Sequence, residues 1–457
     1  MAAEPPVIVG TGPAGTRAAE TLVRAGLRPI VIDEAPASGG QIYRRQPPGF
    51  TRADTEVYGF EADKATRLHR AFDGLADRID YRPNTLVWSI RPDRMHLLRG
   101  GRVNELAFSH AIFATGAMDR VIPFPSWTLP GVFTLGGAQV ALKYQGCAIG
   151  RRVVFLGTGP LLYLVAYQYA RAGARVVAVL DTAPFAGKLA ALPALLARPG
   201  MAAKGMFYLG WLRSRGVTVA SGIRPVGVEG TDAVAGLVWR DDAGREHRTD
   251  CDAIALGFGL KAETQLADLA EVPFTWDNLQ RQWLPERDGW GRTPVGGIYL
   301  AGDGAGILGA DAAELTGERA ALALLQDRGP GDHGQRVAAI NAELDRHRRF
   351  RAGLEAAFPF PDDLARSTAD DTILCRCEGV SAGELRRAAS ELGAGEVNRA
   401  KAFSRVGMGR CQGRVCGPAA AEILAAALGV PIEQAGRLRG QAPVKPLPMA
   451  AVLDTTQ

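Results

Sequence analysis

Residues 7–15 read Val-Ile-Val-Gly-Thr-Gly-Pro-Ala-Gly, and this stretch decides the fold. The apolar run 7–9 predicts a short strand that ends in a glycine turn, and the Ala- and Leu-rich residues after it predict a helix up to residue 25. A second apolar run, 30–32, ends in two acids, where a nucleotide ribose would lie. The glycines permit a tight turn, close approach of the backbone to a pyrophosphate and close helix–strand packing. We therefore predict a dinucleotide site formed by Gly10, Gly12, Pro13, Ala14, Gly15, Asp33 and Glu34.

Length and composition set the outer limits. A chain of 457 residues predicts about three domains. The hydrophobic content of 47%, the charged content of 22% and the net charge of +5 are typical of a globular protein without a nucleic-acid footprint. No apolar run has transmembrane length, and the N-terminus enters its first strand without a signal-like segment. We expect a cytoplasmic protein that is not an integral membrane protein.

The opening pattern occurs a second time. Residues 157–160, Gly-Thr-Gly-Pro, match residues 10–13, and Asp181 falls opposite the acids of the first copy. The repeat predicts a second nucleotide-binding fold with Gly157, Gly159, Pro160 and Asp181 as candidate contacts. The third glycine is replaced by Leu162, which narrows the room for a pyrophosphate. Whether NAD(P), an adenine nucleotide such as ATP or no ligand occupies this fold stays open.

Three more segments favour a flavin in the first fold. Two glycines precede Gln41 in a loop just past the ribose acids, a buried strand runs into a small-residue turn, and a later strand ends in Gly-Asp. Taken alone, each also fits a plain turn or a helix cap. Together with the first fingerprint, they predict FAD contacts from Gly40, Gln41, Ala114, Thr115, Gly116, Gly302 and Asp303.

Four of the six cysteines lie close together in the C-terminal part. Cys147 and Cys251 stand alone, and we expect both to be ordinary small buried residues. Cys375 and Cys377 form one close pair, and Cys411 and Cys416 form a second pair in a glycine-rich setting. Four thiolates in two pairs suit an iron–sulfur cluster or a structural zinc. The glycines let backbone N–H groups turn toward cluster sulfurs. We favour the cluster because an electron carrier explains more than a redox-silent metal beside a flavin.

Residues 5–330 resemble the two-dinucleotide-binding-domain flavoproteins of the glutathione and thioredoxin reductase class. No cysteine pair lies near the first fingerprint, so disulfide reductase chemistry has no reagent here. The C-terminal part resembles the [2Fe-2S] domain of bacterioferritin-associated ferredoxin, except that its later cysteine pair is two residues wider than the usual CxxC.

The motifs Gly40-Gln41-Ile42-Tyr43-Arg44, 159–162, 301–303 and 407–414 together resemble the alpha subunit of heteromeric amine dehydrogenases. Opine oxidase, D-hydroxyproline dehydrogenase, archaeal-type proline dehydrogenase and hydrogen cyanide synthase belong to that family. The resemblance implies FAD and a [2Fe-2S] cluster in this chain, with room for FMN at a subunit interface. It also implies a beta subunit similar to D-amino acid oxidase that oxidises the substrate, and in some complexes a small gamma subunit. The path would end at a downstream electron acceptor.

The expected fold class is α/β, with two Rossmann-like domains and a small α-rich cluster domain. We expect an FAD domain at 1–123 and 285–330, a second nucleotide domain at 124–284, a linker with a helix at 331–370, a cluster domain at 371–430 and a tail at 431–457. No catalytic residue for amine oxidation is identified in the chain.

The expected function is an electron-transfer subunit for the oxidation of an opine, D-hydroxyproline, proline or glycine. One alternative is a free-standing NAD(P)H-dependent flavoprotein reductase, and another is a zinc-stabilised nucleotide sensor.

Overall fold

A parallel sheet of five short strands forms the first nucleotide-binding fold of the computed structural model, which describes residues 4–329 and 331–453. The strands lie in the order β20, β7, β1, β2, β3, with bounds Ile298–Leu300, Ala111–Phe113, Val7–Val9, Ile30–Ile32 and Asp80–Arg82. The register places Val9 beside both Ile32 and Phe113, and Phe113 beside Leu300. The carboxyl ends of β1, β2, β7 and β20 therefore meet at one edge, where α/β sheets bind their ligands.

Helices cover one face of this sheet, and an antiparallel sheet lies on the other side. The helices are α1 (Pro13–Arg24), α3 (Ala62–Asp73) and α10 (Ala310–Arg328), and the antiparallel strands are β4 (Thr85–Arg91), β5 (Arg94–Arg99) and β6 (Arg102–Ala107). Helices α1 and α10 can cross this closely because residue 317 is glycine: a Cβ there would lie 2.0 Å from the Ala14 carbonyl oxygen. The polar segment between residues 51 and 78 folds as α2 (Asp54–Tyr58), η1 (Gly59–Glu61), α3 and η2 (Ala76–Arg78).

The second fold repeats the architecture of the first. Its sheet order is β12, β11, β10, β16, β9, with bounds Thr218–Ser221, Arg175–Asp181, Arg152–Thr158, Ala253–Phe258 and Val132–Thr134. Helices α4 (Leu135–Lys143), α5 (Pro160–Arg171) and α8 (Pro199–Ser214) pack on this sheet. An antiparallel sheet of β13 (Arg224–Glu229), β14 (Gly236–Arg240) and β15 (Glu246–Asp250) is inserted before β16, which the sequence pattern did not predict. The internal repeat thus corresponds to two sheets of the same type, as expected.

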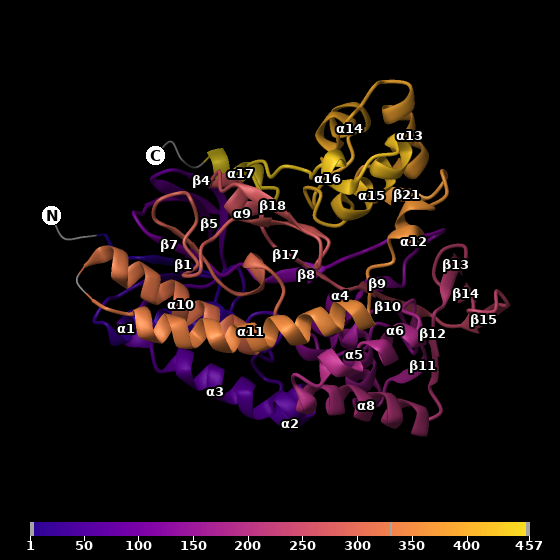
Figure 1. Cartoon of the computed structure of the whole chain (residues 1–457), viewed down its shortest axis with the longest axis horizontal. Coiled ribbons are helices and arrows are strands. Elements are labelled where there is room, and N and C mark those ends of the chain that lie inside the picture. Colours follow the sequence, from indigo (N-terminus) through magenta and orange to yellow (C-terminus); the bar gives the residue numbers. More distant parts are fainter. Residues whose placement is uncertain (1–3, 330, 454–457) are drawn as a thin grey trace.

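Two connections join the folds. The antiparallel pair β8 (Ala117–Asp119) and β17 (Leu260–Ala262) carries the chain out of the first fold and back. The long helix α11 (Gly334–Ala357) contacts α10 at one end and α6 (Phe185–Ala190) and α7 (Leu192–Leu195) at the other, and Figure 1 shows it running across the molecule from the first fold to the second. After β17, α9 (Gln265–Leu269) and the hairpin β18–β19 (Phe274–Asp277, Gln282–Pro285) follow, and Leu266 and Val272 pack in the core of the first fold. We therefore propose that the second domain ends near residue 262 instead of 284.

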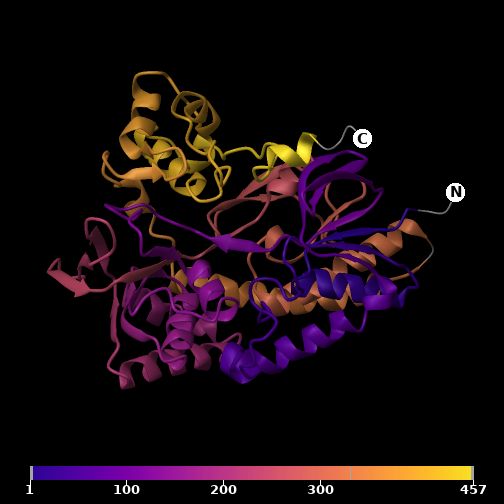
Figure 2. The ribbon, with the colours of Figure 1, turned by 180° about the vertical axis from the view of Figure 1, so that it is seen from behind.

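The C-terminal module is α-rich, as expected. It contains β21 (Ile373–Cys375), β22 (Val380–Ser381), α13 (Ala382–Ser390), α14 (Val397–Ser404), α15 (Gly417–Leu428) and α16 (Ile432–Ala435), and the short helix α12 (Asp362–Arg366) leads into it. Figures 1 and 2 show this module on one side of the molecule, above the junction of the two folds. The following segment returns to the first fold and ends in α17 (Met449–Leu453), and residues 454–457 of the expected tail lie outside the described part.

Candidate nucleotide and iron–sulfur sites

The first glycine turn has the backbone shape that close approach to a pyrophosphate requires. Gly10 has φ +104°, and a Cβ on it would lie 2.3 Å from the Ala114 carbonyl oxygen. A Cβ on Gly15 would lie 1.8 Å from the Gly10 oxygen, so helix α1 can start this close to β1 only with glycine there. Gly12 is the residue before α1, and Pro13 is the first residue of the helix, which leaves the helix N-terminus free of a side-chain cap. Free N–H groups at a helix N-terminus suit a pyrophosphate.

The expected loop lies against this turn. A Cβ on Gly40, whose φ is +63°, would lie 2.9 Å from the Gly12 Cα, so the two backbones form one narrow cradle. Gln41 lies next in the loop and accepts a hydrogen bond from Arg44. The close approach of Gly12 and Gly40 leaves no side chain between these two backbone segments, which suits a pyrophosphate.

The two acids after β2 have different surroundings. The Asp33 carboxylate accepts hydrogen bonds from the Thr11 amide and hydroxyl, at 2.6 and 2.5 Å, and from the Ala35 amide. Burial raises its pKa. Glu34 points instead toward the C-terminal segment and pairs with Lys445 at 2.5 Å. Asp33 is therefore the acid that lies inside the site, whereas Glu34 lies at its rim.

The remaining flavin candidates lie at the same sheet edge. Ala114 to Gly116 follow β7, and Gly302 and Asp303 follow β20. The half-buried Asp303 carboxylate accepts hydrogen bonds from the amides of Leu308 and Gly309, and its partial burial raises its pKa. The structure thus brings together all segments that the sequence assigned to FAD, and their backbone-lined shape fits the cofactor.

The second fold has a different local chemistry. Asp181 is fully buried, and its carboxylate is occupied by the Tyr163 hydroxyl at 2.7 Å, by Lys188 at 2.7 Å and by the Ala183 amide at 2.8 Å. Leu162 is fully buried in the core between α5 and the sheet. Gly157 and Gly159 keep the turn, with φ +147° and +107°, and Pro160 begins α5. The glycine turn of the second fold therefore keeps its shape. The charge of Asp181, the acid expected to bind a ribose, is already neutralised by Lys188.

The four C-terminal cysteines converge. None of them forms a disulfide. Of the two isolated cysteines, Cys251 is buried as expected, whereas the prediction of a buried Cys147 was wrong, because its side chain is exposed. Cys416 shares sulfur hydrogen bonds with Cys375 and Cys411, and Cys411 shares one with Cys377. Among the described residues, no group of three or more His, Cys, Asp or Glu side chains is arranged to hold a single metal ion. The assignment of a cluster site therefore depends on the contacts among the four thiols.

Backbone N–H groups point to these sulfurs, as the glycine-rich setting predicts. The hydrogen bond from Cys416, together with amides of Gly407 and Glu378, lowers the pKa of Cys375 to about 6. The hydrogen bond from Cys416, with amides of Gly413 and Val415, lowers the pKa of Cys411 to about 5. Thiolates are the ligands of iron–sulfur clusters, and N–H donors near the sulfurs stabilise their charge. Burial raises the pKa of Cys377, and the hydrogen bonds to Cys375 and Cys411 raise the pKa of Cys416. The fit of Cys375, Cys377, Cys411 and Cys416 to a cluster therefore rests on their mutual contacts and on the N–H donors around them.

Sequence reasoning missed two ion pairs at these sites, Lys188 with Asp181 and Arg414 with Glu263. The pairs are 7 and 151 positions apart, and no local spacing marks them. Only a buried acid without an adjacent base, as at Asp181, signals that some partner must exist.

Two family matches cover most of the chain. Residues 5–324 match the pyridine nucleotide-disulphide oxidoreductase family, and residues 373–426 match the BFD-like [2Fe-2S] binding domain. No helix in the described ranges is long and apolar enough to cross a membrane.

Several curated proteins are similar along almost the whole length. The A subunit of opine oxidase from Agrobacterium tumefaciens is 36% identical over 97% of this chain and 90% of that protein. Hydrogen cyanide synthase subunit HcnB of Pseudomonas aeruginosa is 34% identical over 98% of this chain and 97% of that protein. Among solved structures, L-proline dehydrogenase from P. horikoshii has a TM-score of 0.73 at 19% identity, over 98% of this chain and 79% of that one, which supports the fold.

These matches identify the cofactors of the chain. The flavoprotein family indicates FAD, and the C-terminal domain indicates a [2Fe-2S] cluster. The chain is a flavin-dependent oxidoreductase that belongs to the pyridine nucleotide-disulphide oxidoreductase family, and within it to the group of opine oxidase A subunits and hydrogen cyanide synthase HcnB.

Proposed function

We propose that this chain is the electron-transfer subunit of a heteromeric dehydrogenase or oxidase for a secondary amine or amino acid. Its relatives are named as subunits of opine oxidase and hydrogen cyanide synthase. In our proposal a D-amino-acid-oxidase-like beta subunit oxidises an opine, D-hydroxyproline, proline or glycine. FAD supplies two-electron and the cluster one-electron chemistry when bound.

The observation that carries the proposal is a direct link between the cluster loop and the flavin edge. Arg414 lies between the ligands Cys411 and Cys416, and its Nε donates to Glu263 at 2.7 Å. The Glu263 carbonyl accepts from the Thr115 hydroxyl at 2.5 Å, and its amide donates to the Gly116 carbonyl at 2.9 Å. One residue thus joins the flavin turn to the cluster loop. If FAD and the cluster occupy these two sites, this link would keep them close to each other, which would suit electron transfer between them.

Further contacts fix the cluster domain in this position. The amide of the Gln265 side chain donates to the Gln412 carbonyl at 2.9 Å. Glu422, with a side chain 2% exposed, accepts two hydrogen bonds from Arg281 at 2.5 and 2.9 Å. The Trp127 indole donates to the Ile373 carbonyl at 2.6 Å. The domain therefore contacts both nucleotide folds and is held as part of the body, not as a tethered appendage.

The second fold has no part in hydride delivery in this proposal. Asp33 in the first fold also accepts three hydrogen bonds, but Asp181 differs from it because a cation, Lys188, pairs with its carboxylate at 2.7 Å. Because Lys188 neutralises the charge that a ribose contact would use, we expect NAD(P) to bind poorly in this fold. No local sequence motif marks an arginine that would hold a substrate carboxylate directly over the flavin. Substrate oxidation is therefore assigned to the partner.

Expression of the chain alone and together with the candidate beta subunit tests the proposal. The chain alone should show flavin and cluster absorbance but reduce no dye with opines, D-hydroxyproline, proline or glycine. The complex should reduce dye with one of these substrates. Turnover by the isolated chain at the rate of the complex would refute the division of labour, and rapid flavin bleaching by NADPH would favour a free-standing reductase.

A further inference from the structure

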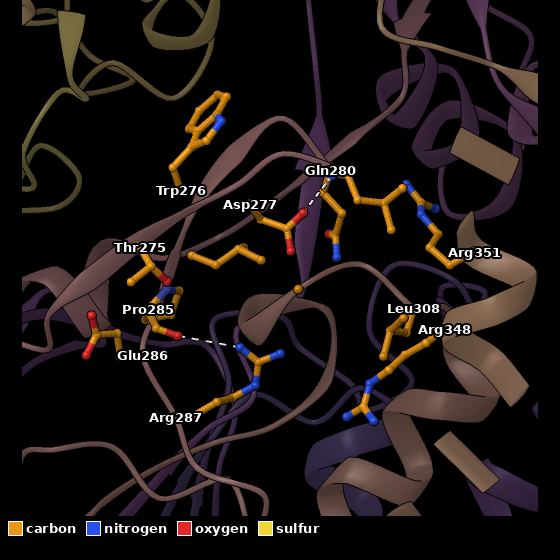
Figure 3. A pocket seen from close by; sticks show the side chains of 13 residues that line it. Thr275, Trp276, Asp277, Gln280, Pro285, Glu286, Arg287, Leu308, Arg348 and Arg351 are labelled. Atoms are coloured by element: carbon orange, nitrogen blue, oxygen red, sulfur yellow. Dashed lines mark hydrogen bonds between the residues drawn. The ribbon is translucent and has the colours of Figure 1, made fainter. Parts of the chain in front are cut away.

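A cavity of about 470 Å³ lies outside every site described so far. The hairpin β18–β19 forms its roof, the loop after η3 (Gly302–Ala305) one wall, and helix α11 the other. Figure 3 shows arginines entering from two sides, Arg287 from the segment after the hairpin and Arg348 from α11, and directed toward the same space. None of the residues assigned to FAD, the second nucleotide or the cluster lines it.

Arg287 is a cation without a counter-ion. Its single hydrogen bond goes from Nη1 to the Pro285 carbonyl at 3.5 Å, and no carboxylate of the described chain lies within ion-pair distance of it. Its Nη2 lies beside Gly306, where a Cβ would be 3.4 Å away. Burial lowers the pKa of Arg287 to about 10, the charge of Arg348 lowers it further, and Asp277 opposes both. Its unused N–H groups are therefore available to a ligand in the cavity.

The surroundings add positive charge. Arg319, which is 3% exposed, donates to Asn341 but has an Nε without a partner. Burial lowers its pKa to about 10, with added repulsion from Arg287 and Arg348. Arg348 pairs only with the exposed Asp345 in its own helix, and Arg351 pairs with Glu355.

Two acids belong to the cavity wall, and neither neutralises Arg287. The Asp277 carboxylate accepts the Gln280 amide at 2.8 Å. In Figure 3 the Glu286 carboxylate points away from the Arg287 guanidinium. The apolar side chains of Leu284 and Leu308 complete the lining. A negatively charged group with a small apolar body suits this combination.

We propose that this cavity binds a small organic oxyanion, with its carboxylate or phosphate group held by Arg287 and Arg348 and its apolar part against Leu284 and Leu308. The guanidinium fork matches the geometry of both groups. Gly306, which lines the cavity, follows Asp303 by three positions in the chain. The ligand would therefore lie close to the expected flavin site without occupying it.

Titration calorimetry of the FAD-loaded full chain at low salt tests the proposal, with inorganic phosphate and succinate as separate probes. Loading with FAD keeps the pyrophosphate cradle filled. Either probe should bind with one site per chain, and the better probe distinguishes a phosphate ester from a carboxylate as the natural ligand. Arg287→Gln and Arg348→Gln should each weaken binding about tenfold to a hundredfold, since charge-assisted hydrogen bonds contribute about 1.5–3 kcal/mol.

Arg336→Gln is the matched control, because Arg336 also lies in α11 but pairs with Glu318 away from the cavity. It should leave binding unchanged. A thermal melt of each variant without probe shows that it folds, and removal of uncompensated charge at Arg287 should not lower Tm. Binding of neither probe, or equal binding by wild type and Arg287→Gln, would overturn the proposal.

Discussion

Replacement of Asp268 by alanine should release the C-terminal segment from the first fold. The Asp268 side chain is 4% exposed and accepts hydrogen bonds from Arg437 at 2.6 and 2.8 Å, and it also accepts the Gly440 amide. Removal of one partner from a buried ion pair costs about 3–5 kcal/mol. Arg437 is 22% exposed and reaches water once the pair is broken, so we expect about 2–3 kcal/mol for this local opening.

Hydrogen exchange at the Val444 amide measures this effect. That amide donates to the Trp88 carbonyl at 3.0 Å and has no contact with Asp268 itself, so it reports on the segment as a unit. A loss of about 2–3 kcal/mol corresponds to exchange about 30-fold to 150-fold faster. The Ala420 amide in α15, bonded to the Cys416 carbonyl, should be unchanged.

Arg439→Ala is the control for this experiment. Arg439 approaches the same carboxylate at 3.7 Å but is 67% exposed, and exposed pairs contribute about 0–1 kcal/mol. Its effect at Val444 should stay below about fivefold. If Asp268→Ala changed only the Gly440 amide and left Val444 exchange within threefold of wild type, the ion pair would not be what holds this segment.

Three other predictions concern the cofactors and pH. Cys411→Ala should abolish cluster absorbance and acid-labile sulfide while FAD stays bound; stoichiometric zinc in the wild-type protein would contradict the assignment. Anaerobic mixing with NADH should leave the flavin oxidised for wild type, because Asp181 is occupied by Lys188, and fast bleaching would show that the second fold delivers hydride. Burial lowers the pKa of Lys143 to about 8, so the unfolded chain binds more protons between about pH 8 and 10 and stability rises with pH across that window. Lys143→Met should therefore raise Tm at pH 7, and the gain should shrink toward pH 10; a constant or negative difference would show that the ammonium is favourably bound.

The sequence predicted what depends on local backbone geometry. The turn at Gly10 to Gly15 is encoded within a few residues, because a residue with a Cβ at position 15 would place that atom 1.8 Å from the Gly10 carbonyl oxygen. The two sheets and the paired cysteines followed from repeats and spacing in the same way. In contrast, the antiparallel sheet at residues 224–250 has short, mixed strands that no periodicity marks.

Polar contacts between distant segments could not be predicted. The partners Asp181 and Lys188 are separated by a turn, and Arg414 meets Glu263 only because two domains fold against each other. The sequence could not predict that Arg287 has no carboxylate partner in the described chain, because this depends on where the tertiary fold places the acids. Such contacts are decided by tertiary packing, and the occupied carboxylate in the second fold is the case where this matters most for function.

The ion pair between Glu34 and Lys445 has a consequence for the biogenesis of the holoprotein. The two residues are 411 positions apart. The first fold is complete only after β20 and α10 (residues 298–328) are made, which is still well before Lys445. During that interval the nucleotide edge of the first sheet is uncovered, and the cofactor has free entry. The segment around Lys445 covers the rim beside Asp33 once the Glu34–Lys445 pair forms, so we expect bound flavin to leave more slowly when this pair is intact than when it is broken.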